Sequence, residues 1–143
     1  MILKKQLILL LFSIFFISNV IAQVSNPQKN INKMVLEYSD GNGNYYKITK
    51  DSISYEPIKR EMSSSGIYDG GEGKSNKITE AEFTLIFKEF ETIFNNKSIH
   101  IPNRMKISGR LRLNNGDDTK AVIIKKSEEQ NQLELLLKEL LKM

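Results

Sequence analysis

The chain has no cysteine and a single histidine among its 143 residues. The lack of cysteine excludes disulfide bonds, thiolate metal sites, a thiol nucleophile and a lipid-modified N-terminal cysteine. The one histidine, His100, lies between Ile99 and Ile101 in a connecting segment, and no recognisable nucleophile turn accompanies it. We therefore expect His100 to be a surface or loop residue, and we predict no catalytic residue, no metal site and no cofactor.

An apolar run is confined to the first 22 residues. Lys4 and Lys5 precede an unbroken apolar stretch from Leu7 to Ile17, and the small residue Ala22 precedes a polar segment. This pattern is typical of a secretory signal peptide that is cleaved after Ala22. A membrane anchor is the alternative, but the run falls short of the roughly 20 apolar residues that span a bilayer. We predict export to the periplasm or the extracellular space, with no stable membrane anchor after cleavage.

Cleavage would leave residues 23–143, which have the size of one ordinary domain. Residues 23–33 are polar and rich in asparagine, so we expect a flexible leader there and a single domain over residues 34–143. Loss of Lys4 and Lys5 leaves 19 basic against 17 acidic residues. This small excess gives little reason to expect nucleic acid as a partner. Without disulfides, the domain must be held together by its apolar core alone.

Apolar residues at every second position predict three strands at the start of the domain. Met34, Leu36 and Tyr38 share one parity and would face one side of a strand. A turn rich in glycine and asparagine follows at residues 40–44. Strands at residues 45–49 and 52–57 are then joined by a two-residue turn. This hairpin would place Ile48 opposite Ile53, and Tyr46 opposite Tyr55.

The regular pattern is lost from Ile58 to Lys77, a segment rich in serine and glycine. Its stretch from Gly70 to Ser75 resembles a phosphate-binding loop, which requires G-x-x-x-x-G-K-[ST] at the start of a helix. Tyr68 occupies the place of the first glycine, and the next predicted helix begins only after Thr79. We therefore interpret this segment as a solvated loop, with a short edge strand within residues 72–78 as an alternative.

Two amphipathic helices are predicted. The first begins at Thr79, where Thr79 and Glu82 can form a capping box, and the second begins at Ser127, where Ser127 and Gln130 can form another. Each helix has an apolar stripe at helical spacing. The stripe of the first comprises Phe83, Ile86, Phe87, Phe90, Ile93 and Phe94, and that of the second comprises Leu133, Leu136, Leu137 and Leu140.

Residues 105–126 predict a second hairpin between the two helices. One parity is apolar and the other basic, with an Asn-Gly turn after Asn114. Residues 121–124 are apolar on both faces, which suggests a central strand. The apolar parity comprises Ile107, Gly109, Leu111 and Leu113, and the other comprises Lys106, Ser108, Arg110 and Arg112. The chain therefore predicts an α+β fold of order β-β-β-α-β-β-α, an antiparallel sheet with both helices on one face.

The basic parity of this hairpin is a candidate contact surface for a partner. Lys106, Arg110 and Arg112, with Lys120 or Lys125, could recognise an acidic protein surface or an anionic glycan. The alternative is that exposed strands carry such residues for solubility and against edge pairing. Interleaved aromatic residues, which single-strand nucleic-acid binders use, are absent from the hairpin.

Two further residue sets are candidates for contact or binding. Tyr68 and Lys74 would contact a partner if the long loop is ordered. Asp40, Asn42 and Asn44 have the odd-numbered spacing of a calcium loop, but the position that requires glycine is Tyr45. A hairpin turn explains the same residues, so we expect no calcium site there.

The layout of a strand pair, a T-x-x-E-F helix start from Thr79 to Phe83, a hairpin and a terminal leucine helix resembles small exported bacterial proteins such as emfourin-type metalloprotease inhibitors. The resemblance covers residues 34–143 in the order of the elements. It implies an antiparallel sheet with two helices and an inhibitor role. The long loop from Ile58 to Lys77 departs from that compact pattern, and no inhibitory motif is present.

These observations predict a small, exported, non-catalytic protein that acts as a protein-binding or inhibitor-like module. The expected partner is another exported or envelope protein. One alternative is a carboxylate-dependent hydrolase acting on envelope glycans, because any two of the 17 acidic residues could meet in space. Another is a structural component of the cell envelope.

Overall fold

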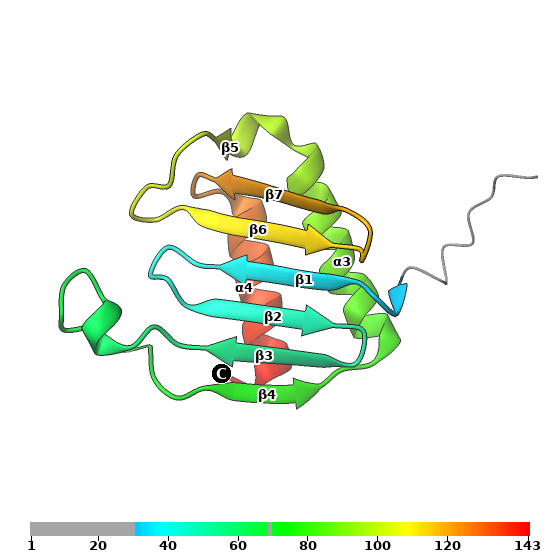
Figure 1. Ribbon diagram of the computed structural model, residues 1–143, viewed down its shortest axis with the longest axis horizontal. Coiled ribbons are helices and arrows are strands. Elements are labelled where there is room, and N and C mark those ends of the chain that lie inside the picture. The colour runs from blue at the N-terminus through cyan, green and yellow to red at the C-terminus, as the bar shows by residue number, and fades with distance from the viewer. Residues whose placement is uncertain (1–30, 69) are drawn as a thin grey trace, which may run out of the picture.

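The computed structural model describes residues 31–68 and 70–143, which form a seven-stranded antiparallel sheet with two helices on one face (Figure 1). The predicted signal peptide, residues 1–22, and residues 23–30 of the predicted leader lie outside the described residues. Ile31 already packs against the core, and Lys50 donates a hydrogen bond to Asn32 over 2.9 Å. The predicted α+β class is confirmed.

Three strands at the start of the domain follow the predicted pattern. They are β1 (Val35–Ser39), β2 (Tyr45–Thr49) and β3 (Ser52–Glu56). The predicted register between β2 and β3 is confirmed, because Ile48 pairs with Ile53 and Tyr46 pairs with Tyr55. The buried tyrosine rings form a row across these strands, with 5.0 Å between the ring centroids of Tyr46 and Tyr55.

A fourth strand, β4 (Lys74–Lys77), follows the long loop and forms one edge of the sheet next to β3. It is the short edge strand that the sequence offered as an alternative. The two residues that resembled part of a phosphate loop, Lys74 and Ser75, therefore lie in a strand rather than at the start of a helix.

Helix α3 (Glu80–Asn95) begins with the predicted capping box. The Thr79 amide donates to the Glu82 carboxylate over 2.6 Å, and the Glu82 amide donates to the Thr79 hydroxyl over 3.2 Å. Four residues of the predicted stripe are fully buried, and the other two are half-buried against the core. The buried residues are Phe83, Ile86, Phe90 and Ile93, and the half-buried residues are Phe87 and Phe94.

After α3 the chain forms a short 3-10 helix, η2 (Lys97–Ile99), and a two-residue strand, β5 (His100–Ile101). The sequence did not predict β5. His100 is half-buried in it, with its Nε2 atom 2.8 Å from the Ile93 carbonyl oxygen. The single histidine is therefore held by the C-terminal part of α3.

The predicted second hairpin is present but begins later than expected, with β6 (Gly109–Asn114) and β7 (Thr119–Ile124). Residues 105–108 form a turn, because the Ser108 hydroxyl donates to the Met105 carbonyl over 2.7 Å and accepts from the Met105 amide. Ser108 is buried and Ile107 is 56 % exposed, the reverse of the prediction. Residues 115–118 connect the strands, and Asn115 Oδ1 accepts from the Asp117 and Asp118 amides.

Helix α4 (Glu128–Leu141) ends the fold, and its predicted capping box is only half formed. The Gln130 amide donates to the Ser127 hydroxyl over 3.3 Å. However, the Gln130 side chain is buried and donates to the Tyr38 hydroxyl over 3.0 Å. It points into the core because the helix packs on β1 at this position.

The strand order in the sheet is β4-β3-β2-β1-β6-β7-β5, and β1 pairs with β6 to join the two hairpins. The prediction of a central position for β7 was wrong, because β7 lies second from the edge. Both helices cover the same face of the sheet, as Figure 1 shows. The core lies between the sheet and the helix layer. It includes Leu36, Ile48, Ile53, Leu111, Ile124, Leu133 and Leu137. Among the described residues, no helix is both long and apolar enough to span a bilayer.

Candidate functional site

The face of the sheet opposite the helices is uncovered and carries two of the predicted contact residues. Arg110 and Arg112 are exposed on β6, where Arg112 lies opposite Glu37 of β1. The Arg112 guanidinium is 3.5 Å from the Glu37 carboxylate, which also accepts a 2.6 Å hydrogen bond from the Tyr45 hydroxyl. Burial, followed by the hydrogen bond to Glu37, raises the pKa of Tyr45 well above its usual value. Arg112 is therefore already partnered.

The other basic residues of the predicted contact face lie elsewhere. Lys106 belongs to the turn before β6, because the strand begins only at Gly109. Lys120 pairs with Leu113, whose parity faces the helices, so it lies on the opposite side of the sheet from Arg112. The prediction of one basic strand face that includes Lys106 and Lys120 was wrong: the turn at Ser108 leaves Lys106 outside the strand, and the pairing with Leu113 puts Lys120 on the helix side.

Three loops gather at the end of the sheet where β1 ends and β2 begins (Figure 1). They are the turn at residues 40–44, the long loop described at residues 57–68 and 70–73, and the turn at residues 102–108. We call this set of three loops the loop end. It brings together two predicted contact residues from distant parts of the chain, Tyr68 and Lys106.

Asn44, which is only 3 % exposed, joins the first two loops. Its side-chain amide donates to Asp40 over 2.7 Å and to the Tyr68 hydroxyl over 3.0 Å, and its carbonyl accepts from the Ile58 amide over 3.1 Å. Asp40 also accepts from the Asn42 and Asn44 amides, both over 2.9 Å. The residues with calcium-loop spacing thus form the hydrogen bonds of a hairpin turn, the structure expected from the sequence.

Further contacts hold the bases of the two longer loops. The Tyr55 hydroxyl donates to the Gly70 carbonyl over 2.6 Å, and a Cβ atom at Gly70 would lie 2.4 Å from the Asn44 side-chain oxygen. On the other side, a Cβ atom at Gly41 would lie 2.8 Å from the Ile107 backbone. These close approaches require glycine, and they fix each loop against the turn at residues 40–44.

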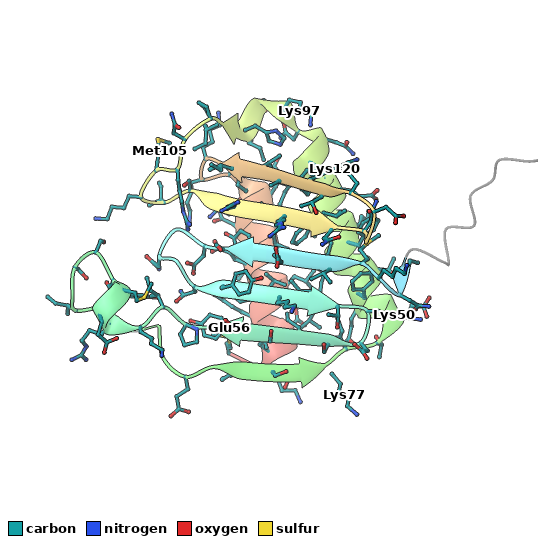
Figure 2. The ribbon with its side chains drawn as sticks, in the orientation of Figure 1. Lys50, Glu56, Lys77, Lys97, Met105 and Lys120 are labelled. Carbon is teal, nitrogen blue, oxygen red and sulfur yellow. The ribbon has the colours of Figure 1, made fainter. Side chains whose placement is uncertain are left out.

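Most of the exposed apolar side chains lie at the loop end. Among the described residues, eight large apolar side chains are exposed, and five of them belong to the two longer loops. Figure 2 shows one of these five, Met105, at this end of the sheet. The five are Met62, Ile67, Tyr68, Met105 and Ile107, with Met62 and Ile67 at 75 % and 80 % exposure. Apolar side chains that are presented on braced loops are a common feature of protein contact surfaces.

Sequence reasoning identified Tyr68 but missed Met62, Ile67 and Met105. These residues follow no strand or helix period, so their exposure could not be inferred from a pattern. Lys74, another predicted contact residue, lies outside the loop end. Its ammonium group donates to the Lys142 carbonyl over 3.2 Å at the end of α4, so its side chain lies towards the helix layer.

Two surface depressions are lined by pairs of carboxylates. One includes Glu56 and Glu61, and the other includes Glu91 and Asp118. All four side chains are exposed, whereas a general acid of a glycoside hydrolase is normally held in apolar surroundings. In the described part of the chain, no three histidine or acidic side chains are grouped so that they could hold a metal ion.

Comparisons of the chain with known protein families, with curated proteins and with solved structures give no significant match. The resemblance to emfourin-type inhibitors therefore stays a prediction from the order of the elements.

Proposed function

We propose that this protein is an exported protein-binding module, of the inhibitor-like kind, that contacts its partner through the loop end. The observation that supports the proposal is the concentration of exposed apolar side chains on two loops that are fixed to one turn. Burial of Met62 and Ile67 would contribute about 1.5 to 3 kcal/mol for each side chain. Methionine is among the residue types that are enriched at protein interfaces.

The hydrogen bonds of Asn44 give the loop end a second property that suits binding. A loop that is already held in its bound conformation loses less entropy on association than a free loop. Tyr68, Ile58 and Asp40 are all held by this one buried side chain. Asn44 therefore links the turn at residues 40–44 to two points of the long loop without the help of a partner.

The charge around the apolar side chains favours a partner of one kind. Lys59, Arg60, Arg104 and Lys106 are exposed on the same two loops, against the exposed carboxylates Glu61 and Glu72. Basic groups around apolar anchors complement an acidic rim around an apolar pocket. We propose that the partner is an exported or envelope protein with a pocket of this kind.

Affinity purification of the tagged protein from the envelope of its own cells tests this proposal. The wild type should retain a partner, and the double substitution Met62→Asp with Ile67→Asp should reduce its recovery at least ten-fold. The matched control is Leu85→Asp with Leu135→Asp, which changes two exposed leucines on the helices, at 54 % and 68 % exposure. Equal losses in both variants, or no partner for the wild type, would refute the proposal.

A structural variant sharpens the same experiment. Asn44→Ala removes the link between the loops while it leaves Met62 and Ile67 in place, so it should weaken partner binding through looser loops. The melting temperature, measured in parallel, shows whether the fold is retained. Recovery of the wild type only with insoluble envelope material, independent of the loop end, would favour a structural role instead.

A further inference from the structure

One edge of the sheet is only partly covered. Strand β5 pairs with β7 at two positions, His100 with Ile124 and Ile101 with Ile123, and the chain then turns away at Pro102. Within the described residues, no strand pairs with the rest of that edge of β7, from Thr119 to Val122. In the described part of the chain, four of the six residues of β7 therefore have a neighbouring strand on one side only.

The direction of the backbone groups identifies the residue that a new strand would bind. The Lys125 amide donates to the Ile99 carbonyl over 2.9 Å, so the backbone groups of Lys125 point away from β6. Successive residues of a strand alternate in direction, so Ile123, Ala121 and Thr119 point the same way. The Thr119 amide is bonded to the Asp118 carboxylate over 2.8 Å. Ala121 therefore presents both its amide and its carbonyl to the open edge.

A shallow depression lies beside this edge on the uncovered face. It has a volume of about 350 Å³, and its lining includes Ile101, Pro102, Ala121 and Ile123, with Arg110 at its side. Arg110 is exposed, and in the described part of the chain it makes no hydrogen bond or ion pair. Its neighbour Arg112 is engaged by Glu37, so Arg110 is the cation of β6 that is free to bind an anion.

The opposite edge of the sheet, strand β4, carries the charged residues that usually protect an edge strand from pairing with another chain. β4 has the sequence Lys-Ser-Asn-Lys, and its Lys77 pairs with Ser52, which places Lys77 on the uncovered face, whereas Lys74 lies towards the helix layer. Lysine on an edge strand discourages pairing with another chain. On the β7 edge, Lys120 faces the helix side of the sheet and leaves the uncovered face at Ala121 without a charge.

The geometry points to a strand-addition site on β7. An extended acidic segment of another protein would pair antiparallel to β7 in line with β5, exchanging two backbone hydrogen bonds with Ala121. A glutamate or aspartate of the segment would lie over the apolar floor formed by Ile101 and Ile123, with its carboxylate bound by Arg110. The site uses residues outside the loop end except for Pro102, so it does not depend on the function proposed above.

A peptide titration tests the site directly. The probe is a capped hexapeptide in which glutamate alternates with valine, added to ¹⁵N-labelled protein produced from the whole coding sequence. The expected result is a saturable shift of the Ala121 and Ile123 amide signals, with slower hydrogen exchange at Ala121. The same peptide with lysine in place of glutamate should bind at least ten-fold more weakly.

Two proline variants form a matched pair. Ala121→Pro removes the outward amide of β7 and should lower peptide affinity at least ten-fold. Ser75→Pro is the control on the other edge. The Ile78 amide donates to the Asp51 carbonyl towards β3, so by alternation the Ser75 amide also points outwards. Proline is tolerated on edge strands where the amide faces solvent, so both variants should fold.

A charge reversal keeps the proposal testable if Ala121→Pro does not fold. Arg110→Glu should exchange the preference, so that the lysine peptide binds more tightly than the glutamate peptide. Met62→Asp with Ile67→Asp should leave peptide affinity unchanged, which separates this site from the loop end. Shifts centred on Ser75, unchanged affinity in folded Ala121→Pro, or concentration-dependent shifts at Ala121 without peptide would overturn the proposal; the last would identify a second copy as the occupant.

Discussion

The two faces of the sheet are built from the same strands but differ in burial: one packs against the helices and the other faces solvent. On β2, Tyr46 and Ile48 face the helices and are 1 % and 0 % exposed, whereas Tyr45 and Lys47 face away from them and are half-buried and exposed, respectively. Side chains of a strand alternate between faces, so a shift of one residue moves a side chain from the core to the surface. Folding therefore constrains the side chains of the covered face more strongly than those of the uncovered face.

The covered face also contains a buried polar group, the Tyr38 hydroxyl. The Tyr38 hydroxyl donates to Glu134 over 2.6 Å and accepts from the Gln130 side chain over 3.0 Å. Burial, followed by the hydrogen bond to Glu134, raises the pKa of Tyr38 far above its ordinary value. These contacts link β1 to α4 inside the core, where a lost partner would leave a buried polar group unsatisfied.

The largest expected difference between the faces is in the free energy of unfolding of variants at two neighbouring positions of β2. Ile48→Ala should lower the free energy of unfolding by about 2 to 5 kcal/mol, because it leaves a cavity in the core. Lys47→Ala, one residue away on the uncovered face, should change it by no more than about 0.5 kcal/mol. Urea denaturation of both variants measures the two values. Similar losses in both variants would contradict the assignment of the faces.

A second prediction concerns the buried hydroxyl of Tyr38. Tyr38→Phe should cost about 1 to 3 kcal/mol, because Gln130 loses an acceptor in the core. Since the folded-state pKa of Tyr38 is raised, its stabilising contribution is fully present below pH of about 10 and is lost as the pH rises further. The unfolding free energy of the wild type should then fall by about 1.4 kcal/mol per pH unit for this tyrosine. If the unfolding free energy of Tyr38→Phe fell with pH above about 10 as steeply as that of the wild type, the contribution assigned to Tyr38 would be wrong.

A third, smaller effect is expected at the start of the helix layer. Thr79→Ala removes the N-cap of α3 and should cost about 1 kcal/mol. The hydrogen bonds from the Thr79 amide and hydroxyl lower the pKa of Glu82, so its contribution is present above the usual carboxyl range and is lost as the pH falls through the folded-state value. Thermal melts between pH 2 and pH 7 should show a weaker acid dependence for Glu82→Gln than for the wild type.

The smallest effect is expected on the uncovered face. Arg112→Ala removes a surface ion pair with Glu37, in which the Arg112 side chain is 48 % exposed. Such pairs contribute about 0 to 1 kcal/mol, so the unfolding free energy should hardly change. The contribution should also decrease at high salt, because ions screen exposed charges. A loss of unfolding free energy above about 2 kcal/mol would show that the uncovered face contributes substantially to stability.

Local patterns in the sequence predicted the parts of the fold that local physics decides. The Thr79 capping box, the β2–β3 register and both apolar helix stripes each follow from residues that are close along the chain. The errors came where distant contacts decide. Gly109 was interpreted only as one apolar position, but a Cβ atom there would lie 2.9 Å from the ring of Tyr38.

The candidate site shows the same limit. Tyr68 and Lys106 were predicted as contact residues for separate reasons, and the fold places both of them at the loop end. Arg112 was predicted as a partner-contact residue, and in the fold it is engaged by Glu37 of β1, which lies 75 positions away along the sequence. Neither outcome could be read from spacing, because each depends on which strands are neighbours in the sheet.

The sequence by itself determined the α+β class, the alternation of the strands and the starts of the helices, because short-range hydrogen bonds and side-chain periods decide them. Only the tertiary structure decided that β1 and β6 lie at the middle of the sheet, that Asn44 links the turn at residues 40–44 to the long loop, and that residues 119–122 of β7 have, within the described part of the chain, a neighbouring strand on one side only. These features arise from pairings between distant segments, whose free energy depends on how the whole core is filled.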